Sequence, residues 1–136
     1  MLKDIETRKV DNFGVAMVPS ELEVQEDGQE WECFLINLKD QPVHQVLVTS
    51  SGYKKSDEEE LRSSTLRYFY DRIEGEMAVR LEIVRPELTQ LTNEYWISFS
   101  LDGHMYDKRF LFVEGSLAQE HLTTVPILNK KGVLIL

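Results

Sequence analysis

Alternation of apolar and polar residues with a period of two is the feature that most constrains what this chain can fold into. It is clearest at residues 77–83, where every second side chain is apolar: Met77, Val79, Leu81 and Ile83. Ala78, Arg80 and Glu82 fall between them and take the other face. Because successive side chains of a strand point to opposite sides, this pattern predicts a strand with one buried face.

Shorter runs of the same kind recur along the chain, with turn residues between them. Residues 13–17 form one such run, which ends at Pro19. In residues 31–38 both alternating sets are apolar, which predicts a central strand covered on both sides. Asp40-Gln41-Pro42 is a turn signal, and we expect residues 43–49 to return as the partner of that strand. Residues 132–136 are too apolar to remain exposed to solvent, so we expect them to pair as a final strand.

The best-defined local unit is a hairpin around Asp102-Gly103. Alternating strands on both sides of Asp-Gly indicate a two-residue type I′ turn, because both central residues of that turn need positive φ. Counting back from the turn pairs Trp96 with Arg109 and Ile97 with Lys108, and directly opposed residues share a face. We therefore expect Trp96 and Arg109 to stack outside the core. Lys108 then points inward, where a charge protects an edge strand.

Helical signals are few and short. Pro86 favours a helical turn over residues 86–91. Ser116 with Gln119, and Ser56 with Glu59, have the spacing of capping boxes. Residues 66–73 favour a strand because they are rich in aromatic and β-branched residues, although their apolar residues would also line a helix.

Together these signals predict one mainly β domain over residues 1–136, with residues 1–10 flexible. Its predicted architecture is an immunoglobulin-like antiparallel β-sandwich of about seven strands with short helical turns. The strand ending at Val84, the helical turn and Asn93-Glu94-Tyr95 have the order of an E–F corner. In such a corner Tyr95 bonds its hydroxyl back to upstream backbone.

The charge balance excludes some partners. The formal net charge is −9, so the chain repels phosphate backbones, and we expect no nucleic-acid partner.

Cys33 is the only cysteine, which rules out an intrachain disulfide and suits a reducing compartment. The first residues lack the apolar run of a signal peptide, and no stretch approaches a membrane span. These observations predict a cytoplasmic protein without membrane contact.

Motifs that carry chemistry are missing from the sequence. It has no nucleophile elbow, zinc helix or phosphate-binding loop. Ser51-Gly52-Tyr53-Lys54 matches Ser-x-x-Lys, but the Ser-Asp-Asn and Lys-Thr-Gly elements that accompany it in penicillin-binding enzymes are absent. His44, His104 and His121 lie far apart in sequence. We expect no catalytic, metal or cofactor-binding residues.

A binding surface is the better lead. Tyrosine, tryptophan and arginine are enriched at interface hot spots. The candidate partner-binding residues are Trp96, Arg109, Tyr53, Arg67, Tyr68 and Tyr70. The alternative, that these aromatic side chains belong to the core, stays open at this point.

Segments between Trp31 and Val133 resemble a family of small bacterial proteins, some of which are labelled as phenylalanyl-tRNA synthetase subunits. The resemblance rests on Val48-Thr49-Ser50-Ser51-Gly52-Tyr53, Ser64-Thr65-Leu66-Arg67, Asn93-Glu94-Tyr95-Trp96-Ile97-Ser98, Asp102-Gly103 and Tyr106-Asp107-Lys108-Arg109-Phe110-Leu111-Phe112-Val113. It carries over no catalytic residue.

Three functions remain as hypotheses. The first is a non-catalytic protein-interaction or assembly module that binds a protein partner, or a second copy through a strand edge. The second, which the family resemblance implies, is an accessory subunit associated with phenylalanyl-tRNA synthetase. The third is a small-ligand carrier, which needs a pocket within or beside the sandwich.

Overall fold

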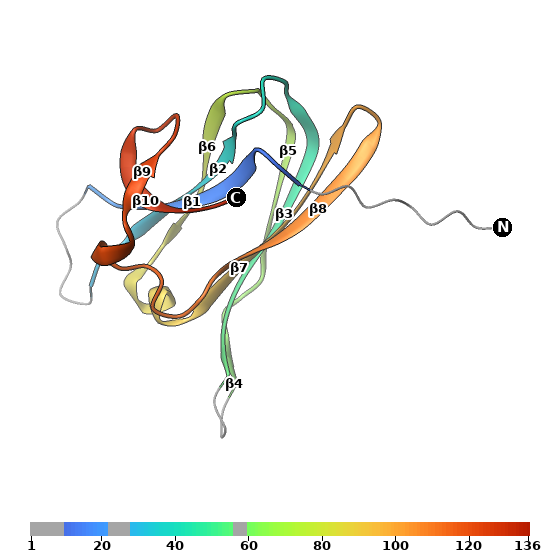
Figure 1. Cartoon of the computed structure of the whole chain (residues 1–136). Coiled ribbons are helices and arrows are strands. Elements are labelled where there is room, and N and C mark those ends of the chain that lie inside the picture. The colour runs from blue at the N-terminus through green and yellow to red at the C-terminus, as the bar shows by residue number, and fades with distance from the viewer. Residues whose placement is uncertain (1–9, 22–27, 56–59) are drawn as a thin grey trace.

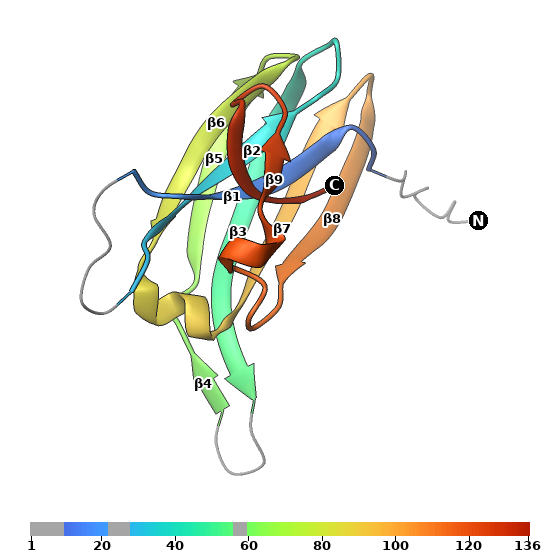
Figure 2. The same ribbon diagram turned by 60° about the vertical axis from the view of Figure 1, so that its left-hand side comes forward.

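The computed structural model describes residues 10–21, 28–55 and 60–136. These residues form two antiparallel sheets that face each other as two layers (Figures 1 and 2). The first sheet has the order β6 (Met77–Val84), β2 (Trp31–Asn37), β1 (Phe13–Pro19), β10 (Lys130–Ile135) and β9 (Thr123–Val125). The second has the order β4 (Glu60–Arg62), β3 (Val43–Lys55), β7 (Thr92–Leu101) and β8 (His104–Phe112), with β5 (Leu66–Ile73) also paired to β3.

The mainly β class and the sandwich-like arrangement are confirmed, but the described residues hold ten strands and not about seven. The two three-residue strands, β4 and β9, are too short to show alternation in the sequence. Residues 66–73 form a strand, as favoured, and the helical turn at Pro86 is the 3₁₀ helix η1 (Pro86–Gln90). The second short helix, η2, spans Gln119–His121. No helix in the described part of the chain is long and apolar enough to cross a bilayer.

The main core lies between the two sheets. Five aromatic side chains are fully buried there: Phe13 of β1, Tyr95 and Phe99 of β7, and Phe110 and Phe112 of β8. Phe13 packs on Phe99 with ring centroids 5.0 Å apart. β2 lies between β1 and β6 in the first sheet, and its residues are buried on the inner face and buried or half-buried on the outer face, in line with the predicted cover on both sides.

The hairpin of β7 and β8 has the predicted register. Trp96 pairs with Arg109 and Ile97 with Lys108, and φ is positive at both Asp102 and Gly103. Trp96 lies outside the core, while Lys108 lies on the inner side of edge strand β8. The Lys108 ammonium donates a hydrogen bond to the backbone carbonyl of Leu136 (2.8 Å).

Two predictions made from longer-range pairing and from capping are wrong. β3 is not the partner of β2, because the turn at residues 40–42 carries the chain across to the other sheet, where β3 pairs with β5 and β7. Ser116 does not cap η2: the N-cap of η2 is Ala118, and the buried Ser116 hydroxyl has no hydrogen-bond partner among the described residues. The Ser56–Glu59 capping box and residues 1–9 lie outside the described residues.

The outer face of the first sheet is covered over β1 and the adjoining part of β2, whereas Ile83 of the edge strand β6 is exposed. Ala16, Val18 and Ile36 point away from the main core, yet they are buried together with Val125. Leu128 and Leu134 pack against them, because the β9–β10 hairpin curls over β1 and β2 (Figure 2). This second cluster is a small core of its own.

Candidate functional site

The outer face of the second sheet brings three of the six candidate partner-binding residues together. Arg67 on β5 and Trp96 on β7 both lie opposite Thr49 of β3, and Arg109 on β8 lies opposite Trp96. In the neighbouring row, Phe69 lies opposite Leu47. Since directly opposed residues share a face, these side chains form one surface, which we call the exposed patch: Leu47, Arg67, Phe69, Trp96 and Arg109.

Apolar groups of the exposed patch remain open to solvent. Phe69 is 60% exposed, Trp96 47% and Leu47 44%. Phe69 and Leu47 were not among the residues predicted to bind a partner. The sequence does contain a sign that Phe69 is exposed. In a strand Phe69 shares a face with the charged residues Arg67 and Asp71, whereas Tyr68 and Tyr70 take the opposite face.

The Trp96 side chain is held in place by its polar neighbours. The Arg109 guanidinium lies 4.6 Å from the centroid of the indole ring, as the hairpin register predicted. Arg109 also pairs with Glu94 (2.8 Å), and the indole N–H donates to Asp107 Oδ2 (3.4 Å). A tryptophan fixed in this way loses little conformational freedom when a partner binds.

The remaining candidate residues lie elsewhere. Tyr53 continues the outer face of β3 beyond the patch, with the Arg62 guanidinium 5.9 Å from its ring. Tyr68 and Tyr70 point inward and pack against the main core. The structure therefore separates these two tyrosines from the other four candidates.

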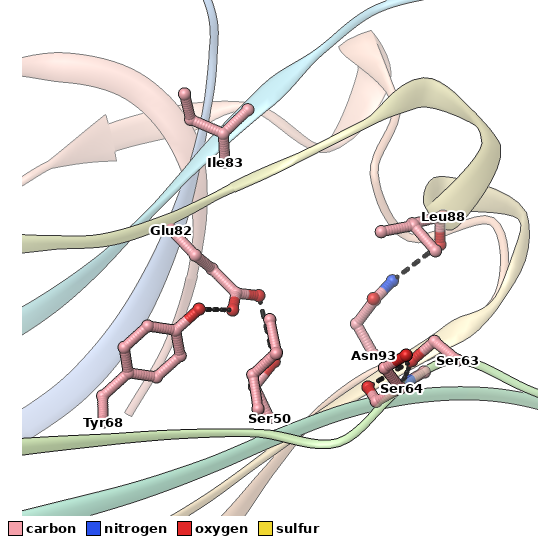
Figure 3. A pocket seen from close by; sticks show the side chains of 10 residues that line it. Ser50, Ser63, Ser64, Tyr68, Glu82, Ile83, Leu88 and Asn93 are labelled. Atoms are coloured by element: carbon pink, nitrogen blue, oxygen red, sulfur yellow. Dashed lines mark hydrogen bonds between the residues drawn. The ribbon is translucent and has the colours of Figure 1, made fainter.

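A second candidate site arises from an irregularity in β6. Cys33 of β2 pairs with Glu82, but the next residue, Phe34, pairs with Arg80, so Leu81 is the extra residue of a β-bulge. After the bulge, the side chains of β6 point to the opposite faces from those that strict alternation predicts. Glu82 therefore points into the sandwich, and Ile83 points outward and is 45% exposed. Figure 3 shows the two side chains on opposite sides of β6. The predicted alternation of residues 77–83 is wrong at Glu82 and Ile83 for this reason.

Three hydroxyl groups donate hydrogen bonds to the inward Glu82 carboxylate. Tyr68 Oη donates to Oε1 (2.8 Å), while Tyr95 Oη (2.8 Å) and Ser50 Oγ (3.0 Å) donate to Oε2. The donors come from β5, β7 and β3, so the bonds join the second sheet to an edge strand of the first. The prediction that the Tyr95 hydroxyl bonds to upstream backbone is wrong, because this carboxylate takes its place.

The ionisable groups around Glu82 are held in their neutral forms. Burial, together with the hydrogen bond to Glu82 and the charge of that residue, raises the pKa of Tyr68. Burial also raises the pKa of Tyr95, with further contributions from Cys33 and Glu82. Burial raises the pKa of the Cys33 thiol as well. At neutral pH both tyrosines therefore keep the protons that they donate.

The Glu82 carboxylate lies at one side of a pocket of about 420 Å³. Across this pocket, Asn93 Nδ2 donates to the carbonyl of Leu88 (3.0 Å; Figure 3). It also donates to the carbonyl of Leu91 (3.3 Å). Gly52 of β3 pairs with Asn93 and also lines the pocket: a Cβ there would lie 3.4 Å from Asn93 Oδ1 and 3.3 Å from Ser63 Oγ. The pocket thus combines a carboxylate, an amide and serine hydroxyls with the apolar side chains of Leu66 and Leu88.

This arrangement combines hydrogen-bonding groups with an apolar wall. Among the described residues no histidine lines the pocket, and the Ser50 hydroxyl donates to the Glu82 carboxylate. His44 lies on β3, His104 starts β8, and His121 ends η2. In the described part of the chain no three histidine, cysteine or acidic side chains gather as a metal site. Lys54 of the Ser-x-x-Lys match pairs with Glu114 (3.2 Å).

Comparison with known proteins adds little. No family model matches the chain, and no curated protein matches it. Among solved structures, the chain has a weak likeness to the sporulation control protein Spo0M from Bacillus subtilis. That match has 14% sequence identity and a TM-score of 0.32, and it covers 78% of this chain and 51% of Spo0M. The chain spans about half of Spo0M, and a likeness this weak carries no argument about function.

Proposed function

We propose that this chain is a non-catalytic protein-interaction module that binds its partner with the exposed patch of the second sheet. The observation that carries the proposal is the exposure of Phe69, Trp96 and Leu47 in adjacent rows of one sheet face. Aromatic residues and arginine are enriched at interface hot spots, and contiguous exposed apolar groups mark binding surfaces. The sheet itself is a rigid support for such a surface.

The charges of the patch define the chemistry of the partner. Arg109 is already paired with Glu94, whereas Arg67 has no ion-pair partner among the described residues. The guanidinium of Arg67 lies on β5 two positions from Phe69, so both face the same partner surface. We therefore propose a protein partner that presents apolar side chains beside a carboxylate, which forms a bidentate pair with Arg67.

We also place the protein in the cytoplasm. Its only cysteine, Cys33, is free and buried, which suits a reducing compartment. An immunoglobulin-like relationship remains part of this proposal, since the two-sheet architecture is compatible with it.

Site-specific photocrosslinking in cells tests the proposed surface. A photoreactive phenylalanine analogue replaces Phe69 in one strain and Thr124, on β9 of the other sheet, in a second strain. We expect a discrete crosslinked protein with the Phe69 probe and none with the Thr124 probe. The crosslinked protein is then purified and titrated with this chain by calorimetry, and Arg67→Glu should weaken that binding by about tenfold or more.

The identity of the crosslinked species decides between the hypotheses. A phenylalanyl-tRNA synthetase subunit bound through the patch would assign the module to that enzyme as an accessory subunit. A crosslink between two copies of this chain would replace the separate partner with a homodimer. Equal crosslinking from both positions, or binding unaffected by Arg67→Glu, would overturn the proposal.

A further inference from the structure

We propose that the pocket beside Glu82 binds an aliphatic primary ammonium group, supplied either by a free amine or by a lysine side chain. This ligand site is separate from the exposed patch and goes beyond the proposed interaction function. The carboxylate would bind the ammonium, and the apolar wall of the pocket would hold the carbon chain.

The electrostatic environment of the Glu82 carboxylate favours a cationic ligand. All three donors to its carboxylate are neutral hydroxyl groups, from Ser50, Tyr68 and Tyr95. No lysine, arginine or histidine forms an ion pair with it in the part of the chain that the structure describes. A partly buried carboxylate without a cation is a site where a bound cation gains more than it would at an open surface.

The Glu82 carboxylate also has an acceptor position to spare. A carboxylate offers about four lone-pair positions, two on each oxygen. Oε2 accepts from two hydroxyls and Oε1 from one, so Oε1 keeps one position free. An ammonium group has three N–H donors. One donor fits the free position on Oε1, and hydroxyl oxygens nearby, such as that of Ser50, can accept another.

The rest of the pocket suits the carbon chain of an amine. Leu66 lies directly opposite Ser50 and therefore faces the same side of the sheet, where it lines the pocket with Leu88. These two side chains provide an apolar wall for a short methylene chain. The volume of about 420 Å³ lies within the range of small-molecule sites. The net charge of −9 also raises the local concentration of cations around the protein.

Asn93 strengthens the match to an extended amine. Its amide nitrogen is occupied by two backbone carbonyls, so its Oδ1 is the atom left to accept a hydrogen bond. This oxygen lies on the Gly52 side of the pocket, and Gly52 lacks the Cβ that would fill the space before it. The pocket therefore offers a charged acceptor at Glu82 and a neutral acceptor at Asn93.

The test is a titration of the ¹⁵N-labelled full chain followed by two-dimensional NMR, with cadaverine and Nα-acetyl-lysine N-methylamide as two separate probes. We expect saturable shifts of the amide signals of Ser50, Ser63 and Asn93 at probe concentrations up to about 10 mM. The neutral analogue 1-pentanol should produce no such shifts. Equal affinity for the two amines indicates a lysine side chain as the natural ligand, and a preference of about tenfold for cadaverine indicates a free diamine.

Two variants keep the test decisive. Glu82→Gln keeps the shape of the side chain but removes its charge, and it should weaken amine binding about tenfold or more. Leu66→Lys leaves Glu82 intact and places a tethered ammonium at the mouth of the pocket, so it should also abolish binding. Since Leu66 is half exposed, this second variant should fold normally.

Control variants separate this inference from the proposed function. Glu94→Gln removes a carboxylate from the outer face and should leave amine binding unchanged. Phe69→Ser should likewise leave it unchanged while it removes partner binding. Absence of saturable shifts at the pocket, or unchanged affinity in both Glu82→Gln and Leu66→Lys, would overturn the ammonium site without affecting the exposed patch.

Discussion

The outer faces of the two sheets differ in how far their apolar side chains are buried by the rest of the chain. On the first sheet, Ala16, Val18 and Ile36 are buried because the β9–β10 hairpin brings Val125 and Leu128 over them. On the second sheet, Leu47 and Phe69 have no such cover and remain exposed. Covering an apolar face with the chain's own residues adds stability, whereas leaving one open keeps it available for binding. This contrast is the main physical support for the proposal that the protein binds its partner with the outer face of the second sheet.

The largest difference between the faces should appear when one aliphatic side chain is removed from each. Ile36→Ala should lower the free energy of unfolding by about 2–5 kcal/mol, because it leaves a cavity beneath Val125 and Leu128. Leu47→Ala should lower it by less than about 1 kcal/mol, because half of that side chain already faces water. Urea unfolding of the two variants measures both values. Similar losses would show that the second sheet is also covered.

The cover itself can be disturbed at Gly132 on β10. A Cβ at this position would lie 2.6 Å from the backbone oxygen of Met17 and 2.9 Å from Val125 Cγ2. Gly132→Ala should therefore push the hairpin away from β1 and cost about 1–3 kcal/mol of unfolding free energy. The same unfolding experiment, together with faster hydrogen exchange of the Val125 amide, reports this change. A variant as stable as the wild type would show that the hairpin does not need this close approach.

Much of the fold was predictable where the deciding contacts are local. The hairpin register followed from Asp102-Gly103, because a two-residue turn leaves only one way to pair the strands. The apolar residues on both faces of β2 correctly predicted cover on both sides. The partner of β2 was not predictable, since the turn at residues 40–42 can either reverse a strand within one sheet or carry it to the other.

The candidate sites were harder to predict, for two physical reasons. The exposed patch depends on which parity of β5 faces outward, and that is decided by its pairing with β3. The Glu82 pocket depends on a bulge, which is defined only when Cys33 and Phe34 of β2 are seen opposite Glu82 and Arg80. Alternation alone placed Glu82 in solvent, because the extra residue at Leu81 leaves no mark in the sequence pattern.

A smaller effect on stability is expected at the centre of the exposed patch. Trp96→Ala should cost less than about 1 kcal/mol, the value of an exposed cation–π contact with Arg109. Phe99→Ala, three residues along the same strand but fully buried, is the matched control and should cost about 3–5 kcal/mol. Thermal unfolding compares the two variants, and crosslinking from position 69 should weaken in Trp96→Ala alone at temperatures where both remain folded. A large loss of stability in Trp96→Ala would place this side chain in a core.

The smallest effect concerns the ion pairs of the two outer faces, which are closely matched. Arg80 pairs with Glu32 on the first sheet (3.1 Å) and Arg109 with Glu94 on the second (2.8 Å). The arginine side chains are 58% and 54% exposed, and both glutamates are 20% exposed.

Double-mutant cycles with glutamine at these positions should give coupling free energies of about 0.2–1 kcal/mol for both pairs, falling at high salt. Equal values would mean that charge does not distinguish the faces, so the difference between them lies in apolar cover. A much stronger coupling at Arg109 and Glu94 would instead mean that the second sheet is held rigid by its ion pair. Preorganisation of Trp96 would then contribute to binding along with exposure.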